Sequence, residues 1–451
     1  MTGGFGEPAL RQALERTLAA ATGDEAEALV LGRTLALTRF ANNAIHQNVV
    51  ETAAHLRVRV AVGTRVAAVW TNRLDGDGVA AAARQASELA RVVPENPRWA
   101  GLPAAGPAPG AGGFAESTVT ATPERRAHAA GVLCRAAAGA GFQAAGFVST
   151  AVNEVAVAST RGTRAYHAGT VAEAQAVARG ATGSGFADRC HADLDGIDVE
   201  SVAAEAVGTA RRAQQPRDCP AGTYEVVLSP YAVADLVEFL GSQLTGLAVE
   251  EGRSFVGGRL GSRVTGEAVT LVEDPLDPDG LPRGFDFEGV PTTPLALIER
   301  GVARAVVYDA QTAARNGARN TGHALPTGTA VPLPMHLRLE PGTRTREALL
   351  AGVQQGLYVT RFWYTRWVHP LRTIVTGMTR DGTFLVERGE VAGPVRNLRF
   401  TQSYHEALDG LVAAESALTL QRLDLWDYDA GSTRVPAVHL SAFTFTGATP
   451  E

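Results

Sequence analysis

One segment near the middle of the chain carries the pattern of a helix that must be buried. Ser229 followed by Pro230 is a typical start, because a serine side chain can cap the first turn and a proline there misses no needed N–H group. Apolar residues then recur along one side, so the helix must pack against other elements over its length. The segment contains no histidine. The apolar positions are Val233, Leu236, Val237, Leu240, Leu244 and Leu247.

The first half of the chain mixes helical and strand patterns. Helical stretches place apolar residues three or four positions apart, whereas strand stretches alternate apolar and polar residues. Gly63 and Thr64 separate two alternating runs and predict a hairpin turn. Thr122 and Asp198 are each positioned to cap a helix. The helical patterns cover residues 10–21, 79–90, 122–135 and 198–214, and the strand patterns cover 55–62, 66–70 and 143–179.

A break in the pattern divides the chain. Residues 215–222 contain two prolines and one glycine, which is typical of a domain boundary. Beyond this point strand patterns dominate, with hairpin turns expected at residues 299–301 and 387–389. We therefore expect an α+β protein, with an N-terminal α/β domain over residues 1–215 and a C-terminal domain rich in antiparallel strands over residues 216–446.

Residues 94–113 form the longest stretch without periodicity. Proline, glycine and alanine dominate it, so we expect a loop. Its glycines neither follow a strand nor open a helix, which argues against a phosphate-binding loop.

Composition narrows the class of function. The chain has 451 residues and a net charge of −6, so its electrostatics favour no nucleic-acid partner. No stretch approaches the roughly 18 consecutive apolar residues of a membrane span. The first residues lack the pattern of a secretory signal. Three cysteines, odd in number and without zinc-site spacing, indicate a reducing cytoplasm.

Several short motifs follow one another in an order typical of one family. Singly each is weak, but together they resemble the TldD/PmbA family of zinc peptidases, also called modulators of DNA gyrase. The resemblance covers most of the chain, is strongest over residues 224–395, and implies the two-domain fold of that family. The motifs are Gly-Arg-Ser-Phe at 252–255, Leu-Val-Glu-Asp-Pro at 271–275, Asp-Phe-Glu-Gly-Val-Pro-Thr at 286–292, Asn-Thr-Gly-His-Ala at 320–324, Leu-Glu-Pro-Gly at 339–342, Gly-Leu-Tyr-Val-Thr at 356–360, and the segment 381–390.

The chemistry that this resemblance implies is missing from the chain. The TldD branch carries His-Glu-x-x-x-His on the helix described above, and a later cysteine supplies a third zinc ligand. Here the corresponding window includes Glu238, Phe239 and Gln243, and no cysteine follows Cys219. Zinc in a catalytic site needs about three N, S or O donors, and a phenylalanine offers none. We therefore expect neither catalytic nor metal-binding residues in this chain.

A chain that lacks these zinc ligands is similar to the PmbA branch of the family, also called TldE, whose members pair with a TldD-like subunit. The resemblance implies a heterodimer enclosing a chamber that admits unfolded peptides and holds them as an added β-strand. Zinc would then belong to the partner. Two alternatives remain open: a stand-alone homodimeric peptide-binding protein, and a metallopeptidase with a relocated site built from His323, His369 and His405.

Two further segments carry candidate residues. Ser403 and Glu406 have the spacing of a capping box, which explains His405-Glu406 better than a metal motif does. The segment 361–367 alternates like a strand and combines aromatic with cationic residues. Single-stranded nucleic acid would suit such residues, but the acidic balance of the chain favours a cavity lining or a subunit contact. The candidates for contact with substrate or a partner are Arg361, Trp363, Tyr364, Trp367 and His369.

Overall fold

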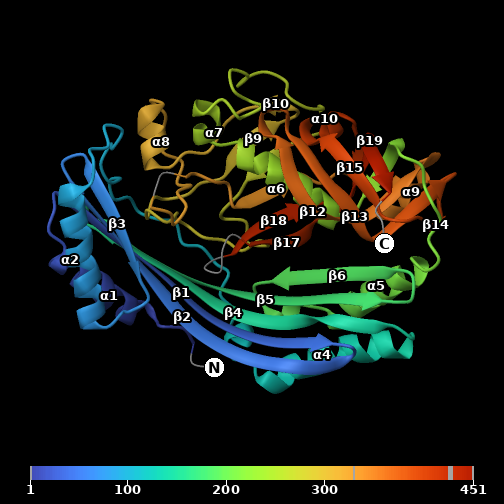
Figure 1. The fold of residues 1–451 in the computed structure, drawn as a ribbon, viewed down its shortest axis with the longest axis horizontal. Helices are drawn as coiled ribbons and strands as arrows, with labels where there is room; N and C mark the ends of the chain where they lie inside the picture. The colour runs from blue at the N-terminus through green and yellow to red at the C-terminus, as the bar shows by residue number, and fades with distance from the viewer. Residues whose placement is uncertain (1–2, 329–330, 425–429, 449–451) are drawn as a thin grey trace.

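The computed structural model describes residues 3–328, 331–424 and 430–448. A curved N-terminal sheet lies beneath a C-terminal half that contains two further sheets (Figure 1). Helices cover the outer face of the N-terminal sheet, and its inner face meets the C-terminal half. The α+β class expected from the sequence is confirmed.

The N-terminal sheet has the strand order β3-β2-β1-β4-β5-β6, and all of its pairs are antiparallel. The predicted hairpin at Gly63 and Thr64 joins β2 to β3, and the strand pattern predicted over residues 143–179 forms the long β4–β5 pair. The strands are β1 (Glu25–Ala41), β2 (Ala44–Val62), β3 (Arg65–Thr71), β4 (Gln143–Ser159), β5 (Arg164–Arg179) and β6 (Ser184–His191).

Small side chains let the helices approach this sheet closely. Alanines dominate the two apolar clusters between the helices and the sheet, so the backbones pack with few large side chains between them. Thr122 and Asp198 cap their helices through the N–H groups of Arg125 and Ser201, as predicted. The helices are α1 (Glu7–Ala20), α2 (Gly76–Val92), α3 (Glu116–Val119), α4 (Pro123–Gly139), α5 (Val199–Arg212) and the short 3-10 turn η1 (Leu194–Gly196).

A buried charge network fastens the inner face of the sheet to the C-terminal half. Glu27 on β1 accepts hydrogen bonds from Arg57 at 2.6 Å and from Arg59 at 2.8 Å, both on β2. Arg59 also donates to Glu288 at 2.8 Å. Charges this deeply buried are tolerated because each finds an opposite charge.

The C-terminal half is built from two sheets. The larger has the order β12-β7-β19-β15-β13-β14, and the extra pairing of β12 with β13 closes five of these strands into a ring. Its strands are β7 (Gly222–Leu228), β12 (Gln355–His369), β13 (Ile374–Glu387), β14 (Glu390–Pro394), β15 (Leu398–Ser403) and β19 (Val438–Ala448), with β16 (Leu411–Ala414) beside β19.

The second sheet has the order β10-β9-β8-β11-β18-β17. The predicted turns at residues 299–301 and 387–389 join β9 to β10 and β13 to β14. The strands are β8 (Leu271–Glu273), β9 (Leu295–Glu299), β10 (Val302–Ala303), β11 (His336–Leu339), β17 (Thr419–Asp424) and β18 (Ala430–Val435). The remaining helices are α6 (Pro230–Gln243), α7 (Gly246–Glu250), α8 (Ala310–Arg315), α9 (Arg346–Ala351), α10 (Tyr404–Asp409) and the 3-10 turn η2 (Pro370–Arg372).

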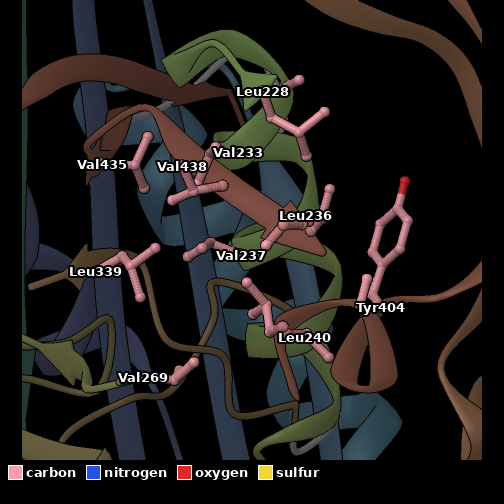
Figure 2. Close-up of a cluster of buried hydrophobic side chains, with 14 of the residues drawn as sticks. Leu228, Val233, Leu236, Val237, Leu240, Val269, Leu339, Tyr404, Val435 and Val438 are labelled. Atoms are coloured by element: carbon pink, nitrogen blue, oxygen red, sulfur yellow. The ribbon is translucent and has the colours of Figure 1, made fainter. Parts of the chain in front are cut away.

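Helix α6 is the buried helix that the sequence predicts. It packs against β12 of one sheet and against β11 and β18 of the other. Val233, Leu236 and Leu240 are almost fully shielded from solvent within this core (Figure 2). Burial of each such side chain contributes roughly 1.5–3 kcal/mol. The helix therefore holds the two sheets of the C-terminal half together.

Three local predictions are wrong. Ser229 does not cap α6, because its hydroxyl donates to the Thr360 carbonyl on β12. Ser403 forms no capping box, because its hydroxyl donates to the Arg372 carbonyl at 2.9 Å. The alternation predicted for residues 361–367 breaks after Trp363, where the register of β12 shifts and Tyr364 adopts a φ of 57°. The two serine errors have the same cause, which is a hydrogen-bond partner distant in the sequence.

Candidate functional site

Aromatic side chains fill the position on α6 where a metal motif was considered. The ring of Phe239 lies 4.9 Å from that of Trp367 on β12 and 5.8 Å from that of Tyr404 on α10, both in edge-on geometry. Figure 2 shows Tyr404 beside α6, on the side of Leu240. The structure thus brings two predicted residues together, Phe239 and Trp367, and gives both of them a packing role.

Two carboxyl groups of α6 lie near these rings. Asp235 accepts hydrogen bonds from the hydroxyls of Tyr404 and Thr365, each at 2.7 Å. Burial raises the pKa of Asp235 to about 6, although both hydrogen bonds act in the opposite direction. Burial also raises the pKa of Glu238 to about 8, and the neighbouring Asp235 carboxylate adds to this effect. Glu238 is therefore mostly protonated at pH 7.

The donor set on α6 does not fit a zinc site. Phe239 offers no donor atom, and the buried Gln243 has a neutral amide whose Nε2 donates to the Ser242 hydroxyl at 3.3 Å. Glu238 alone could supply a ligand oxygen, whereas zinc needs about three protein ligands. Over the described residues, no group of three or more His, Cys, Asp or Glu side chains could hold a metal ion. The three cysteines are buried and free.

The histidines considered for a relocated site have separate surroundings. His323 is buried, with its Nε2 3.5 Å from Glu273 Oε1 and its Nδ1 2.9 Å from the Thr321 hydroxyl. His405 shares a 2.8 Å hydrogen bond with Thr373, and its ring stacks on Phe255.

His369 lies exposed at the end of β12. A further buried histidine, His336, lies 3.4 Å from the same Glu273 oxygen that faces His323. The sequence offered no signal for His336.

The aromatic and cationic residues of β12 divide into an inner and an outer set. Arg361 belongs to the inner set, because its guanidinium donates to Asp381 at 2.7 Å and lies 3.9 Å from the ring centre of Phe186. Trp363 and Tyr364 belong to the outer set, with 44% and 63% of their surface exposed. The two sets nevertheless touch, because the Arg361 guanidinium also lies 5.3 Å from the ring centre of Trp363.

The outer set is made of cation–aromatic stacks. Arg380 lies 4.7 Å from the ring centre of Trp363, and Arg366 lies 4.4 Å from that of Tyr364. Val368 and Leu371, at the turn towards β13, are exposed as well. This surface on the β12–β13 hairpin combines apolar area with unburied positive charge.

Comparison with known sequences identifies the family. The sequence profile of the PmbA/TldA metallopeptidase C-terminal domain matches residues 221–447, which is half of the chain. This chain belongs to the PmbA/TldD metallopeptidase family. The profile of domain 1 of the same family matches residues 26–90, which include β1, β2 and β3.

Individual members of the PmbA/TldD family are distant from this chain. A metalloprotease of Methanothermobacter thermautotrophicus is 24% identical over 228 residues, which are 48% of each chain. A TldD homologue of Haemophilus influenzae, also named a metalloprotease, is 28% identical over 213 residues, 45% of this chain and 43% of the relative. The chain thus matches about half the length of these curated relatives.

Two solved structures share the whole fold. TldE from Thermococcus kodakarensis superposes with a TM-score of 0.87 at 20% identity, over 97% of this chain and all of the other. A protein of Thermotoga maritima named as a candidate modulator of DNA gyrase superposes with a TM-score of 0.84 at 19% identity, again over 97% and 100%. At these identities the likeness establishes the fold alone.

Several family motifs have a structural explanation here. Glu273 accepts hydrogen bonds from the backbone N–H groups of Met335 and His336 at 3.0 and 2.9 Å. Asp286 accepts three more, from Glu288, Val290 and Ala324, each at 2.9 Å. These carboxyl groups satisfy buried backbone donors, so they hold loops in position.

No helix within the described residues is long and apolar enough to cross a membrane.

Proposed function

We propose that this chain is a non-catalytic, TldE-like subunit of a cytoplasmic zinc peptidase that degrades or matures unfolded peptides. Its TldD-like partner would carry the His-Glu-x-x-x-His motif and the zinc. One observation supports the proposal above all: the motif position on α6 holds a phenylalanine packed between Trp367 and Tyr404.

The surface around Trp363 and Tyr364 supports a protein partner. Aromatic residues and arginines are enriched in the buried centres of protein interfaces, and large contiguous apolar patches are rare on monomers outside binding sites. Here exposed rings stack with Arg366 and Arg380 on one hairpin. We assign this surface to the contact with the TldD-like subunit.

The test is a comparison of the chain alone with the chain co-expressed with a family member that retains the motif. We expect the two to co-purify in equal amounts. Zinc analysis should find metal only when the partner is present, and cleavage of an unfolded, fluorescently labelled casein should require the partner. A complex in which both motif histidines of the partner are replaced by alanine is the control, and it should assemble without cleaving.

Near-stoichiometric zinc together with cleavage by the chain alone would refute the proposal. If the chain forms a stable dimer by itself and binds no motif-bearing relative, the stand-alone peptide-binding function would replace it. The relocated site has little support, because His323, His369 and His405 each have different neighbours in the fold.

A further inference from the structure

Part of the edge of strand β5 has no neighbouring strand. On one side β5 pairs with β4 from Arg164 to Arg179. On the other side β6 pairs only with residues 172–179, and Figure 1 shows β6 running along one end of β5. Main-chain groups of residues 164–171 that point away from β4 therefore have no partner in β6.

The direction of these main-chain groups follows from one hydrogen bond. The Thr170 N–H points away from β4 and donates to the Gly113 carbonyl at 2.7 Å. Because the direction alternates along an antiparallel strand, the N–H and C=O groups of Tyr166 and Ala168 also point away from β4. Within the described residues, no backbone group bonds to them from that side. The edge thus offers the Tyr166 C=O as an acceptor, the Ala168 N–H as a donor and the Ala168 C=O as a second acceptor, in that order.

A slot of about 650 Å³ lies beside this edge. One wall is β5 at residues 164–168, and the other is formed by residues 108–111 of the long loop. Phe114 and Phe285 add aromatic surface to the lining. Small-molecule sites occupy about 300–1,000 Å³ and combine apolar walls with a few polar groups, so the slot has the size and lining of such a site.

The charged side chains around the slot are already paired. Glu154 accepts hydrogen bonds from the Tyr166 hydroxyl at 2.8 Å and from two backbone N–H groups. Arg11 and Arg164 each pair with an exposed glutamate. Burial lowers the pKa of His167 to about 4, so its ring is uncharged at pH 7. The slot therefore favours a ligand that bonds to the main chain of β5.

The order of the three main-chain groups selects among planar ligands. A ligand edge with a donor, an acceptor and a second donor would satisfy all of them. Adenine is the nucleobase that comes nearest, because its N6 amino group donates, its N1 accepts and its C2 carries only a hydrogen. In the same alignment, guanine, cytosine and uracil would each place a carbonyl oxygen against a main-chain carbonyl, and both oxygens would lack a donor.

We propose that the slot binds the adenine ring of a nucleoside or nucleotide. The N6 amino group donates to the Tyr166 carbonyl, and N1 accepts from the Ala168 N–H. Apolar side chains such as Phe114 cover the ring, as they commonly do for bases recognised outside a duplex. The slot lies apart from α6, none of whose residues lines it, so the proposal does not depend on zinc or on a TldD-like partner.

A series of ligands tests the pattern of hydrogen bonds by isothermal titration calorimetry on the chain alone. Adenosine should bind saturably. The riboside of 2,6-diaminopurine adds a donor that faces the Ala168 carbonyl, so it should bind up to about tenfold more tightly than adenosine. Inosine has a carbonyl oxygen in place of the amino group and an N–H at N1, so it should bind at least about tenfold more weakly.

The nucleoside and the nucleotide are distinguished by a second comparison. AMP carries the same base as adenosine, so it should bind as well. Tighter binding of AMP would identify a nucleotide as the ligand, with its phosphate at Arg11 or Arg164, which line the slot. Equal or weaker binding of AMP would identify a nucleoside. Both results support the adenine site.

Two glycines of the loop provide matched variants. Gly110 lines the slot and Gly112 does not, and a side chain added at either meets no atom within 4 Å. Gly110→Tyr should weaken adenosine binding at least about tenfold, while Gly112→Tyr should leave it unchanged. Ala168→Pro removes the N–H that faces N1 and should weaken binding to a similar extent.

Thermal unfolding of each variant will show whether it folds. The proposal is overturned if the wild-type chain does not bind adenosine, if inosine binds as tightly as adenosine, or if Gly110→Tyr and Gly112→Tyr bind alike. The ligand series needs no variant, so it decides the question even where a substitution prevents folding. None of these outcomes bears on zinc or on the TldD-like partner, so the two proposals can fail separately.

Discussion

Helix α6 and the outer edge of β5 differ in how many of their groups have a packing or hydrogen-bond partner. Around α6 the space is filled, with Phe239 against Trp367 and Tyr404 and with Asp235 holding two hydroxyl groups. Along β5 the backbone groups of Tyr166 and Ala168 face an open slot. Catalysis by a metal depends on particular side chains, whereas hydrogen bonding at a strand edge depends on an unpaired backbone. The two regions therefore differ in the kind of group that is exposed: side chains are packed together around α6, and main-chain groups line a cavity along β5.

The two carboxyl groups of α6 differ in pKa because their hydrogen-bond partners differ. Asp235 and Glu238 lie one turn apart, yet burial raises the pKa of Asp235 only to about 6 and that of Glu238 to about 8. Hydroxyl donors on β12 and α10 account for part of the difference, because they stabilise the charged form of Asp235.

The largest effect is expected from returning an acidic residue to the motif position. Phe239→Glu would put a carboxylate between Trp367 and Tyr404 and close to Asp235, and it should lower the free energy of unfolding by about 4 kcal/mol or more. Urea unfolding measures this loss at pH 7. Phe239→Leu is the control, and we expect it to cost about 1 kcal/mol. A Phe239→Glu variant as stable as Phe239→Leu would show that Phe239 does not have the packing role assigned to it.

A core deletion in α6 should have the next largest effect. Leu236 is fully buried between the two sheets, so Leu236→Ala should cost about 3 kcal/mol through lost apolar burial and the cavity left behind. Leu89 on α2 is 38% exposed and provides the control, because Leu89→Ala should cost less than about 1 kcal/mol. Equal losses in urea unfolding would contradict the structural role assigned to α6.

Local patterns predicted α6 and the long loop well. The apolar residues from Val233 to Leu244 lie on one face of a helix, and this spacing predicts the helix. Residues 94–113 lack any period, and this predicts the loop. Each prediction depends only on residues that are neighbours in the sequence. Family motifs likewise predicted the family and the fold class. The part of the candidate site that lies on one helix was thus accessible from the sequence.

Contacts between segments that are distant in the sequence could not be predicted from the sequence. Ser229 is an excellent capping residue by local rules, yet its hydroxyl bonds to Thr360, 131 positions away. The candidates on β12 were treated as one surface, but Arg361 turns inward to Asp381 while Trp363 stays exposed. The slot depends on how far β6 extends along β5, and strand register carries no short-range signal.

A smaller effect is expected in the pH dependence of stability. The pKa of Glu238 is about 8 in the folded protein and 4.5 ordinarily, so the folded state keeps a proton that the unfolded chain releases. Stability therefore falls as the pH rises from 4.5 to 8. Glu238→Gln removes this loss, and its advantage over the wild type should grow by on the order of 2 kcal/mol between pH 5 and pH 8.

Urea unfolding across this pH range measures the advantage of Glu238→Gln. Asp235→Asn is the comparison. Because the pKa of Asp235 is about 6, most of the change in stability that its titration causes lies at lower pH than the change caused by Glu238. If Glu238→Gln and the wild type show parallel pH profiles, Glu238 is charged in the folded protein, and the buried acid described for α6 is wrong.

The smallest effect is expected at the open edge of β5. Proline removes a backbone N–H, and it is tolerated where that N–H faces no partner. Ala168→Pro should therefore change the free energy of unfolding by less than about 1 kcal/mol. Ala174→Pro lies in the same strand where β6 is paired, and there the lost hydrogen bond and the altered backbone should cost about 3 kcal/mol or more. Equal losses at the two positions would mean that the N–H of Ala168 has a hydrogen-bond partner in solution.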